Sequence, residues 1–444
     1  ILNMKFNTKT IHGGQKHDIA YGSVMPPIYQ TSTYAQSTPG GHKGFEYSRT
    51  HNPTRQALEN AFASIENGKF GLAFGSGLAA IDAVIKLLEP GDEVISTNDL
   101  YGGSYRLFTS IFKKFGIKFH FIGMENANNI EKHVNDNTKL IWVETPTNPM
   151  MNIIDINACS KIAKKYNLLL AVDNTFATPY LQQPLNLGAD IVMHSATKYL
   201  GGHSDVVMGA LVVKDEALAD KLYFIQNASG AVCGPQDSFL VLRGIKTLHI
   251  RMQRHCENGL RVANYLKAHA KVDQVYWPGF EEHPNHAVAK EQMDDFGGML
   301  SFTTKKDSLE RAIKVIENLK IFTLAESLGG VESLIEHPAI MTHASLPEVV
   351  LDTPEEIAEG ERPLTEEEIA QICTPEGDTP NFGAVKTGGN YAAAMRQVVM
   401  AQRELGADQV LFAPGGIVQE TGAANFVLIE GNELLTKPLD GSIL

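Results

Sequence analysis

The sequence contains little cysteine and no long apolar run. Four cysteines occur among 444 residues, far apart and without any Cys-x-x-Cys pair. This spacing argues against a zinc ribbon or a disulfide scaffold and fits a reducing cytoplasm. No apolar run reaches the roughly 18 residues that a membrane helix needs, and the first residues contain no apolar segment typical of a signal peptide. We therefore predict a cytoplasmic protein with no metal site and no membrane partner.

Excess positive charge is also absent, because the net charge is −13. This value argues against nucleic acid as the main partner. Residues 348–378 contain eleven acidic residues and one basic residue, Arg362, so they supply −10 of the net charge. We interpret this stretch as a solvated linker between nearly balanced parts of the chain. The length, with 43% hydrophobic and 20% charged residues, predicts a globular protein of two or three domains.

From about residue 68 onward, short apolar runs alternate with helical patterns. Apolar side chains recur on one helical face over residues 78–88, which predicts a helix there. The pattern at 157–166 predicts a second helix. Strands are predicted at 70–74, 93–97, 118–123, 139–144, 168–173 and 190–195. This alternation indicates an α/β fold in which helices cover both faces of a largely parallel sheet.

Chemically useful residues follow several of these strands, and in open α/β sheets ligands bind beyond the carboxyl ends of the strands. The residues found there are Gly75-Ser76-Gly77-Leu78, Tyr101, Asn148, Asp173, Ser195, Thr197 and Lys198. Glycines at a helix start bind phosphate, and a tyrosine stacks on a flat ring. An aspartate holds a ring nitrogen protonated, and a lysine forms a Schiff base with an aldehyde. Together these features describe a site for pyridoxal phosphate, which stabilises amino-acid carbanions.

Each of these features alone has an ordinary structural explanation. A Gly-Ser-Gly segment is often a tight turn, Asp173 could cap a helix, and Lys198 could simply be solvated. His283 and His286 could be taken for a metal pair, but a surface loop containing a proline is the better interpretation. The coincidence of all the strand-end features in the expected order favours the cofactor interpretation.

Several longer motifs resemble the Cys/Met-metabolism family of pyridoxal-phosphate enzymes, which includes cystathionine γ-synthase and cystathionine γ-lyase. The resemblance covers residues 4–347. The motifs are PPIYQTSTY, YSRTHNPTR, LYGGSYRLF, VETPTNPM, AVDNTFATP, HSATKYLGGHSDVVMG and ESLGGVESLIEHPAIMTHAS. The resemblance implies an aspartate-aminotransferase-like α/β fold with a truncated small domain, pyridoxal phosphate as cofactor, and a homodimer that usually forms a tetramer.

The resemblance also implies roles for individual residues. Lys198 and Tyr101 are the catalytic residues: Lys198 binds the cofactor and moves protons, and Tyr101 stacks on the ring and donates a proton to the leaving group. The expected cofactor-binding residues are Tyr47, Arg49, Gly77, Leu78, Tyr101, Asp173, Ser195, Thr197 and Lys198. Among them, Tyr47 and Arg49 serve the neighbouring subunit's site. The expected substrate-binding residues are Arg106, Asn148, Glu326 and Ser327.

Two activities at the substrate Cγ remain open, γ-elimination as in a cystathionine γ-lyase and γ-replacement on an O-activated homoserine as in a γ-synthase. The segment Glu326-Ser327 resembles the γ-acting members of the family. Methionine γ-lyases tend to carry a cysteine at the position of Gly103, so the glycine argues against that relative. Both remaining activities use small amino-acid substrates. The sequence does not distinguish the lyase activity from the synthase activity.

The resemblance ends after Pro347. The family continues to a segment of the type RLSVG, whose arginine binds the substrate α-carboxylate, and no such segment follows here. From about residue 383 the chain instead resembles branched-chain, class-IV aminotransferases, with Lys386 matching their lysine, Glu420 their ring-nitrogen partner, and Tyr391 nearby. Two alternatives therefore stay open, an aminotransferase activity of this C-terminal fragment and an inactive cofactor-binding fusion.

The patterns divide the chain into five parts. We predict an N-terminal arm at 1–55, a cofactor-binding domain at 56–255 and a truncated small domain at 256–347. An acidic linker at 348–378 and an aminotransferase-like fragment at 379–444 complete the chain.

Overall fold

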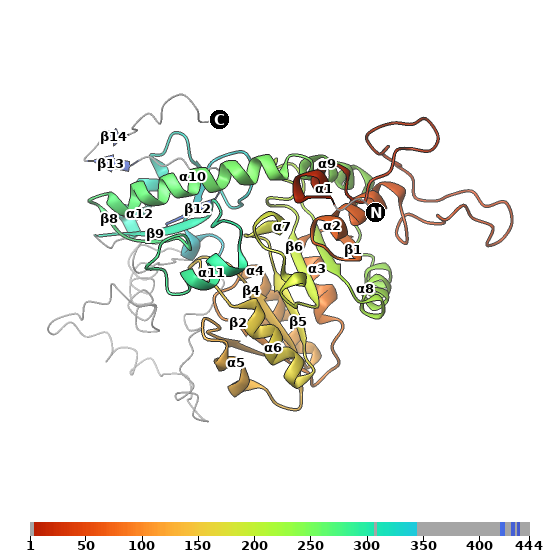
Figure 1. Cartoon of the computed structure of the whole chain (residues 1–444), viewed down its shortest axis with the longest axis horizontal. Coiled ribbons are helices and arrows are strands. Elements are labelled where there is room, and N and C mark those ends of the chain that lie inside the picture. Colours follow the sequence, from red (N-terminus) through yellow and green to blue (C-terminus); the bar gives the residue numbers. More distant parts are fainter. Residues whose placement is uncertain (1–3, 306–308, 344–417, 422–427, 431–432, 436–444) are drawn as a thin grey trace, which may run out of the picture.

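The computed structural model describes residues 4–305, 309–343, 418–421, 428–430 and 433–435 (Figure 1). A seven-stranded sheet has the strand order β1-β7-β6-β5-β4-β2-β3. Its strands are β1 Phe70–Phe74, β2 Glu93–Thr97, β3 Lys118–Ile122, β4 Thr138–Glu144, β5 Leu169–Asp173, β6 Ile191–Ser195 and β7 Gly209–Val213. A second sheet of five strands and a two-stranded hairpin, β13 Leu428–Glu430 with β14 Glu433–Leu435, complete the described strands.

The predicted parallel sheet is confirmed, with one strand of opposite direction that the sequence patterns did not predict. Strands β6, β5, β4, β2 and β3 are parallel, whereas β7 is antiparallel to both of its neighbours, β1 and β6. In register, Glu144 of β4 pairs with Asp173 of β5, and Asp173 pairs with Met193 of β6. The carboxyl ends of three parallel strands therefore meet at one edge, which is where ligands bind in such sheets.

Helices cover both faces of this sheet because alternate strand residues point to opposite sides. Val192 belongs to a buried cluster with α2 and α9, whereas its neighbour Met193 packs with α3 and α8 on the other face. The helices around the sheet are α2 Pro53–Ile65, α3 Gly77–Ile85, α4 Gly102–Arg106, α5 Asn128–His133, α6 Ile156–Tyr166, α7 Thr178–Leu181, α8 Glu216–Ser229 and α9 Pro235–Ile245. Strand β7 is buried along its whole length, as a central strand requires.

The long helix α10, Leu248–Ala268, extends from the large sheet to the second sheet, across the top of Figure 1. The predicted domain boundary at residues 255 and 256 falls inside this helix. The second sheet has the order β10-β11-β12-β9-β8, and α10 and α12 pack against it in one apolar cluster. Its elements are β8 Val272–Tyr276, α11 His286–Gln292, β9 Leu300–Thr304, α12 Leu309–Glu317, β10 Thr323–Leu324, β11 Leu334–Glu336 and β12 Val418–Thr421.

The N-terminal region begins with α1, Phe6–His12, which packs on α2 and α10. Between α1 and α2 the chain extends away from the body, on the right of Figure 1. Large apolar side chains are exposed along this extension, including Ile19, Tyr21 and Val24. Within the described part of the chain, no helix combines the length and the apolar character needed to cross a membrane.

Candidate active site

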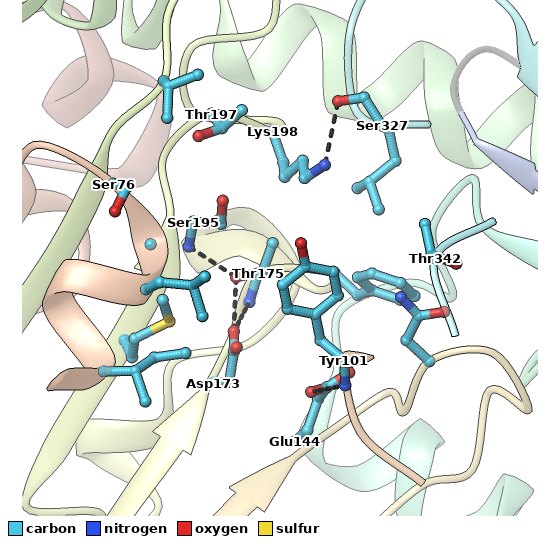
Figure 2. A pocket seen from close by; sticks show the side chains of 18 of the residues that line it. Ser76, Tyr101, Glu144, Asp173, Thr175, Ser195, Thr197, Lys198, Ser327 and Thr342 are labelled. Atoms are coloured by element: carbon cyan, nitrogen blue, oxygen red, sulfur yellow. Dashed lines mark hydrogen bonds between the residues drawn. The ribbon is translucent and has the colours of Figure 1, made fainter. Parts of the chain in front are cut away.

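A cavity of about 240 Å³ opens at the carboxyl ends of β4, β5 and β6, next to the second sheet (Figure 2). Hydroxyl groups of Ser76, Ser195 and Thr197 lie on one side of it, and Ser327 and Thr342 lie on the opposite side. The side chains of Lys198, Tyr101 and Asp173 lie between them. The lining residues are Ser76, Gly77, Leu78, Ile81, Tyr101, Glu144, Asn148, Asp173, Thr175, Phe176, Met193, Ser195, Thr197, Lys198, Val207, Ser327, Leu328, Glu336 and Thr342.

Asp173 is the last residue of β5 and is held by a short chain of hydrogen bonds. The backbone N–H and hydroxyl of Thr175 both donate to its Oδ1, at 3.0 and 2.5 Å. The backbone N–H of Ser195 in turn donates to the Thr175 hydroxyl at 2.8 Å. Burial raises the pKa of Asp173, while the Thr175 hydrogen bonds and the nearby His194 lower it. These donors stabilise the carboxylate form, which pairs well with a protonated ring nitrogen.

A buried polar pair lies behind Asp173. The imidazole Nε2 of His194 is 2.5 Å from Oε1 of Glu66, and the Asn174 amide donates to the same oxygen at 3.0 Å. Both His194 and Glu66 are 1% exposed. Buried polar groups are costly unless they are hydrogen-bonded. The bonds from Glu66 to His194 of β6 and to Asn174, which follows Asp173, therefore hold these two segments in position.

Lys198 lies in the turn that follows β6, and its Nζ is 3.1 Å from the hydroxyl of Ser327. Burial lowers the pKa of the Lys198 amine, and the carboxylates of Glu336 and Glu326 oppose this effect. A partly desolvated amine is easier to deprotonate and is therefore a better nucleophile and base.

Tyr101 precedes α4, and its ring lies over the cavity. Its backbone N–H donates to Oε2 of Glu144 at 3.0 Å. Gly103 gives the ring its space, because a Cβ at that position would lie 2.3 Å from Cε1 of Tyr101. Burial raises the pKa of the Tyr101 hydroxyl, so the group stays protonated and able to donate near neutral pH.

The start of α3 forms one end of the cavity. Ser76 caps this nine-residue helix, accepting from the backbone N–H of Ala79 at 3.1 Å, and the helix then begins at Gly77. A Cβ on Gly77 would lie 3.1 Å from Oγ of Ser195, so a glycine keeps the backbone close to that hydroxyl. Free N–H groups at a helix start beside hydroxyls suit a phosphate dianion.

The donor set fits pyridoxal phosphate. One end offers helix N–H groups and hydroxyls for phosphate, Asp173 suits the ring nitrogen, and Lys198 suits the aldehyde. The buried Oδ1 of Asn148, another lining atom, has no hydrogen-bond partner among the described residues and could accept one from a ligand. Thr197 contributes less directly, since its hydroxyl also bonds to both backbone groups of Met208, at 3.0 and 3.2 Å.

Two predicted substrate-binding residues, Asn148 and Ser327, line the cavity, whereas Arg106 and Glu326 are exposed and do not line it. Both of the latter still act on the site through their charge. The carboxylate of Glu326 raises the pKa of Lys198, and the guanidinium of Arg106 lowers that of Tyr101. Their role in substrate binding stays a prediction.

The sequence patterns missed several lining residues, of which two are carboxyl groups. Glu144 ends β4 as Asp173 ends β5, so its place in the strand could have revealed it. Burial, and next the charge of Asp173, raise the pKa of Glu144 well above the usual range. Glu336 ends β11, is 2% exposed and accepts from the Thr342 hydroxyl at 2.8 Å. Burial raises its pKa to about 7.

Tyr47 and Arg49 line a different hollow of this chain, near the start of α9. The Arg49 Nη1 donates to the backbone oxygen and to Oδ1 of Asn227, at 2.8 and 3.1 Å. Its guanidinium carbon is 5.5 Å from the centre of the Tyr47 ring. These two residues are therefore not brought to the cavity of their own chain.

Of the three residues named by the aminotransferase resemblance, the structure describes one. Lys386 and Tyr391 lie outside the described residues. The backbone of Glu420 lies in β12, paired with Ile335 of β11 and Leu300 of β9.

The two histidines that could be taken for a metal pair bond to backbone oxygens instead. His283 is 3.1 Å from the carbonyl oxygen of Met151, and His286 is 2.9 Å from that of Pro278.

The chain is similar in sequence and in structure to known proteins. The sequence model of the family described as Cys/Met metabolism PLP-dependent enzyme matches residues 7–355. A cystathionine beta-lyase of Coxiella burnetii is 54% identical over 344 residues, which are 77% of this chain and 89% of that protein. A cystathionine gamma-lyase of Bacillus subtilis is 52% identical over 344 residues, 78% of this chain and 90% of that protein. The crystal structure of metB from Corynebacterium glutamicum matches with a TM-score of 0.79 and 39% identity, covering 96% of this chain and 95% of that one.

Proposed function

Because the chain belongs to the Cys/Met metabolism PLP-dependent enzyme family, we propose that it acts at Cγ of cystathionine-type substrates. It is a PLP-dependent enzyme of trans-sulfuration. The observation that carries the proposal is the cavity in which Lys198, Asp173 and Tyr101 meet beside Ser327. The reaction is γ-elimination of cystathionine or γ-replacement on an O-activated homoserine.

We assign cofactor binding to residues on three sides of the cavity. The start of α3 at Gly77, with Leu78, Ser195 and Thr197, would hold the phosphate, and Asp173 would pair with the ring nitrogen. When bound, PLP supplies the electron sink that stabilises a carbanion at the substrate Cα. Tyr101 would lie against the ring and exclude water from one face.

The chain's own groups would move the protons. Lys198, with its pKa lowered by burial, would take the Cα proton and return it at later steps. The Ser327 hydroxyl accepts a hydrogen bond from the Lys198 amine, which orients that amine. Tyr101, held protonated by its raised pKa, would protonate the leaving sulfur or oxygen. Asn148 offers an unpaired amide oxygen to a substrate ammonium or hydroxyl group.

Product analysis tests the assignment of the reacting carbon. With cystathionine and water, γ-elimination releases cysteine, 2-oxobutanoate and ammonia, whereas β-elimination releases homocysteine, pyruvate and ammonia. We expect 2-oxobutanoate in excess over pyruvate, or cystathionine from O-activated homoserine plus cysteine. A Lys198→Ala variant is the matched control. Pyruvate as the main product would overturn the Cγ assignment, and no product from PLP-loaded protein would overturn the activity.

We also propose a homo-oligomer in the cytoplasm. The support for the oligomer is that Arg49 and Tyr47 line a hollow separate from the cavity of their own chain. The support for the compartment is that the described cysteines, Cys159, Cys233 and Cys256, are free thiols. Light scattering of the purified protein and cell fractionation test these two statements.

A further inference from the structure

Strand β12 comes from the part of the chain that departs from the family pattern, yet it lies in the middle of the second sheet. Its residues Val418–Thr421 pair antiparallel with β11 on one side and with β9 on the other. In register, Gln419 pairs with Glu336 of β11 and with Ser301 of β9. The segment is thus a central strand and not an added edge.

Without this segment the second sheet would fall into two pieces. Among the described strands, β9 pairs otherwise only with β8, and β11 pairs otherwise only with the two residues of β10. Two-stranded pieces are marginal by themselves, and their facing edges would present unpaired backbone groups. With the segment in place, the facing residues Leu300, Ser301 and Ile335 are 0% exposed. The segment therefore supplies backbone partners to two edges that would otherwise lack them.

One edge of this slot lines the cavity, and the other bonds to a residue beside it. Strand β11 ends at Glu336, which lines the cavity and accepts from Thr342. The hydroxyl of Ser301 on β9 donates to the backbone oxygen of Pro149 at 2.6 Å, next to the lining residue Asn148. A strand that holds β9 and β11 together thereby holds this side of the cavity in place.

The sequence around β12 suits insertion as a short strand. Val418 and Thr421 are β-branched, and Gly415-Gly416 and Gly422 bound the segment. The structural match to the Corynebacterium glutamicum protein covers 96% of this chain, so it includes residues after 355, where the family match ends.

We propose that residues 418–421 are an intramolecular donor strand that completes the second sheet and supports the cavity. The strand between β9 and β11 is supplied by the same chain, from a segment that follows the acidic stretch at 348–378 in the sequence. This inference does not depend on which reaction the site catalyses.

Hydrogen exchange of the full-length protein tests it. In a central strand, consecutive residues bond to opposite neighbours, so Gln419→Pro with Glu420→Pro removes a backbone donor toward each side. We expect amides of β9 and β11 to exchange at least about tenfold faster in this double variant. Amides of β4 and β5 should stay protected, which separates local opening from global unfolding. The matched control is Ile429→Pro in β13, which among the described strands pairs with β14 alone.

Three outcomes would overturn the proposal. The first is unchanged exchange of β9 and β11 in the double variant, and the second is an equal effect of Ile429→Pro. The third is protection that falls on dilution of the wild-type protein, because a strand donated by a second copy depends on concentration. Protection that is independent of concentration and lost only in the double variant supports the intramolecular strand.

Discussion

The Nζ of Lys198 lies 3.1 Å from the hydroxyl of Ser327, a residue 129 positions later in the chain. Ser327 has a backbone φ of +146°, which residues with a Cβ rarely adopt. Such backbone strain persists only where the surrounding structure enforces it, and it concentrates at functional sites. The two residues join the large sheet to the loop before β11, so their contact aligns the amine with both parts of the cavity.

Removing the Ser327 hydroxyl should impair turnover more than folding. We expect Ser327→Ala to lower kcat/KM about ten- to a hundredfold, the effect of losing a hydrogen bond to a charged group. The melting temperature should stay near that of the wild type. The control is Ser204→Ala, since Ser204 also has a positive φ, of 53°, and bonds to Glu332 at 2.8 Å outside the cavity. Equal losses in both variants would contradict a role of Ser327 at Lys198.

Only one lysine should hold the cofactor covalently. Lys198 lies in the cavity with Ser195, Asp173 and Tyr101, to which we assign the phosphate, the ring nitrogen and ring stacking. Lys386 is a candidate only through the resemblance of residues 383–444. We expect borohydride reduction of the PLP-loaded protein, followed by peptide mapping, to give a pyridoxyl label on Lys198. A label mainly on Lys386 would instead support the aminotransferase resemblance of residues 383–444.

Stability should depend on pH through Glu336. Its pKa is raised from 4.5 to about 7, so the folded chain holds this proton more tightly than the unfolded chain does. The stabilisation is therefore full below pH 4.5 and is lost as the pH rises toward 7. For the cofactor-free protein, the unfolding free energy of wild type relative to Glu336→Gln should fall by up to about 3 kcal/mol over this window.

Denaturant unfolding at several pH values between 4.5 and 8 measures this difference. The control is Glu216→Gln, which removes one negative charge from a side chain that is 71% exposed and paired with Lys69. If the difference between wild type and Glu336→Gln does not change with pH, Glu336 does not hold the proton assigned to it.

The sequence predicted the half of the site that lies on parallel strands. Asp173 and Lys198 follow apolar runs whose period and order already specify the sheet edge, so local patterns were sufficient. Glu336 and Thr342 reach the cavity only because the second sheet packs beside the first, which no local pattern encodes. Strand β7 was not predicted, and the apolar pattern of residues 209–213 could not have shown that the strand runs antiparallel to its neighbours. For β12, four residues are too few to reveal partners so far away in the chain.

The arm that carries Arg49 should serve a neighbouring subunit. Since arginine–phosphate bonds are charge-assisted, Arg49→Ala should weaken PLP binding about tenfold or more. Mixing Arg49→Ala with Lys198→Ala subunits should restore one complete site in each mixed dimer, with its absorbance and activity. Arg243→Ala, which removes an exposed arginine of α9, is the matched control. A mixture no better than its two parents would contradict the exchange of arms.

Turnover should be slow because, among the described residues, no arginine lines the cavity to pair with the substrate α-carboxylate. Of the described residues that line the cavity, Lys198 is the only cation, and the chain departs from the family pattern before the arginine-bearing segment. Leaving one partner of a buried charge pair alone costs roughly 2–5 kcal/mol, which is on the order of 30-fold to a few thousandfold in kcat/KM. A chimera whose residues after 347 are replaced by a family-type ending should gain this factor while binding PLP equally well. Equal kcat/KM values for the two proteins would mean that Asn148 and Ser327 suffice to hold the carboxylate, or that the native tail supplies its own cation.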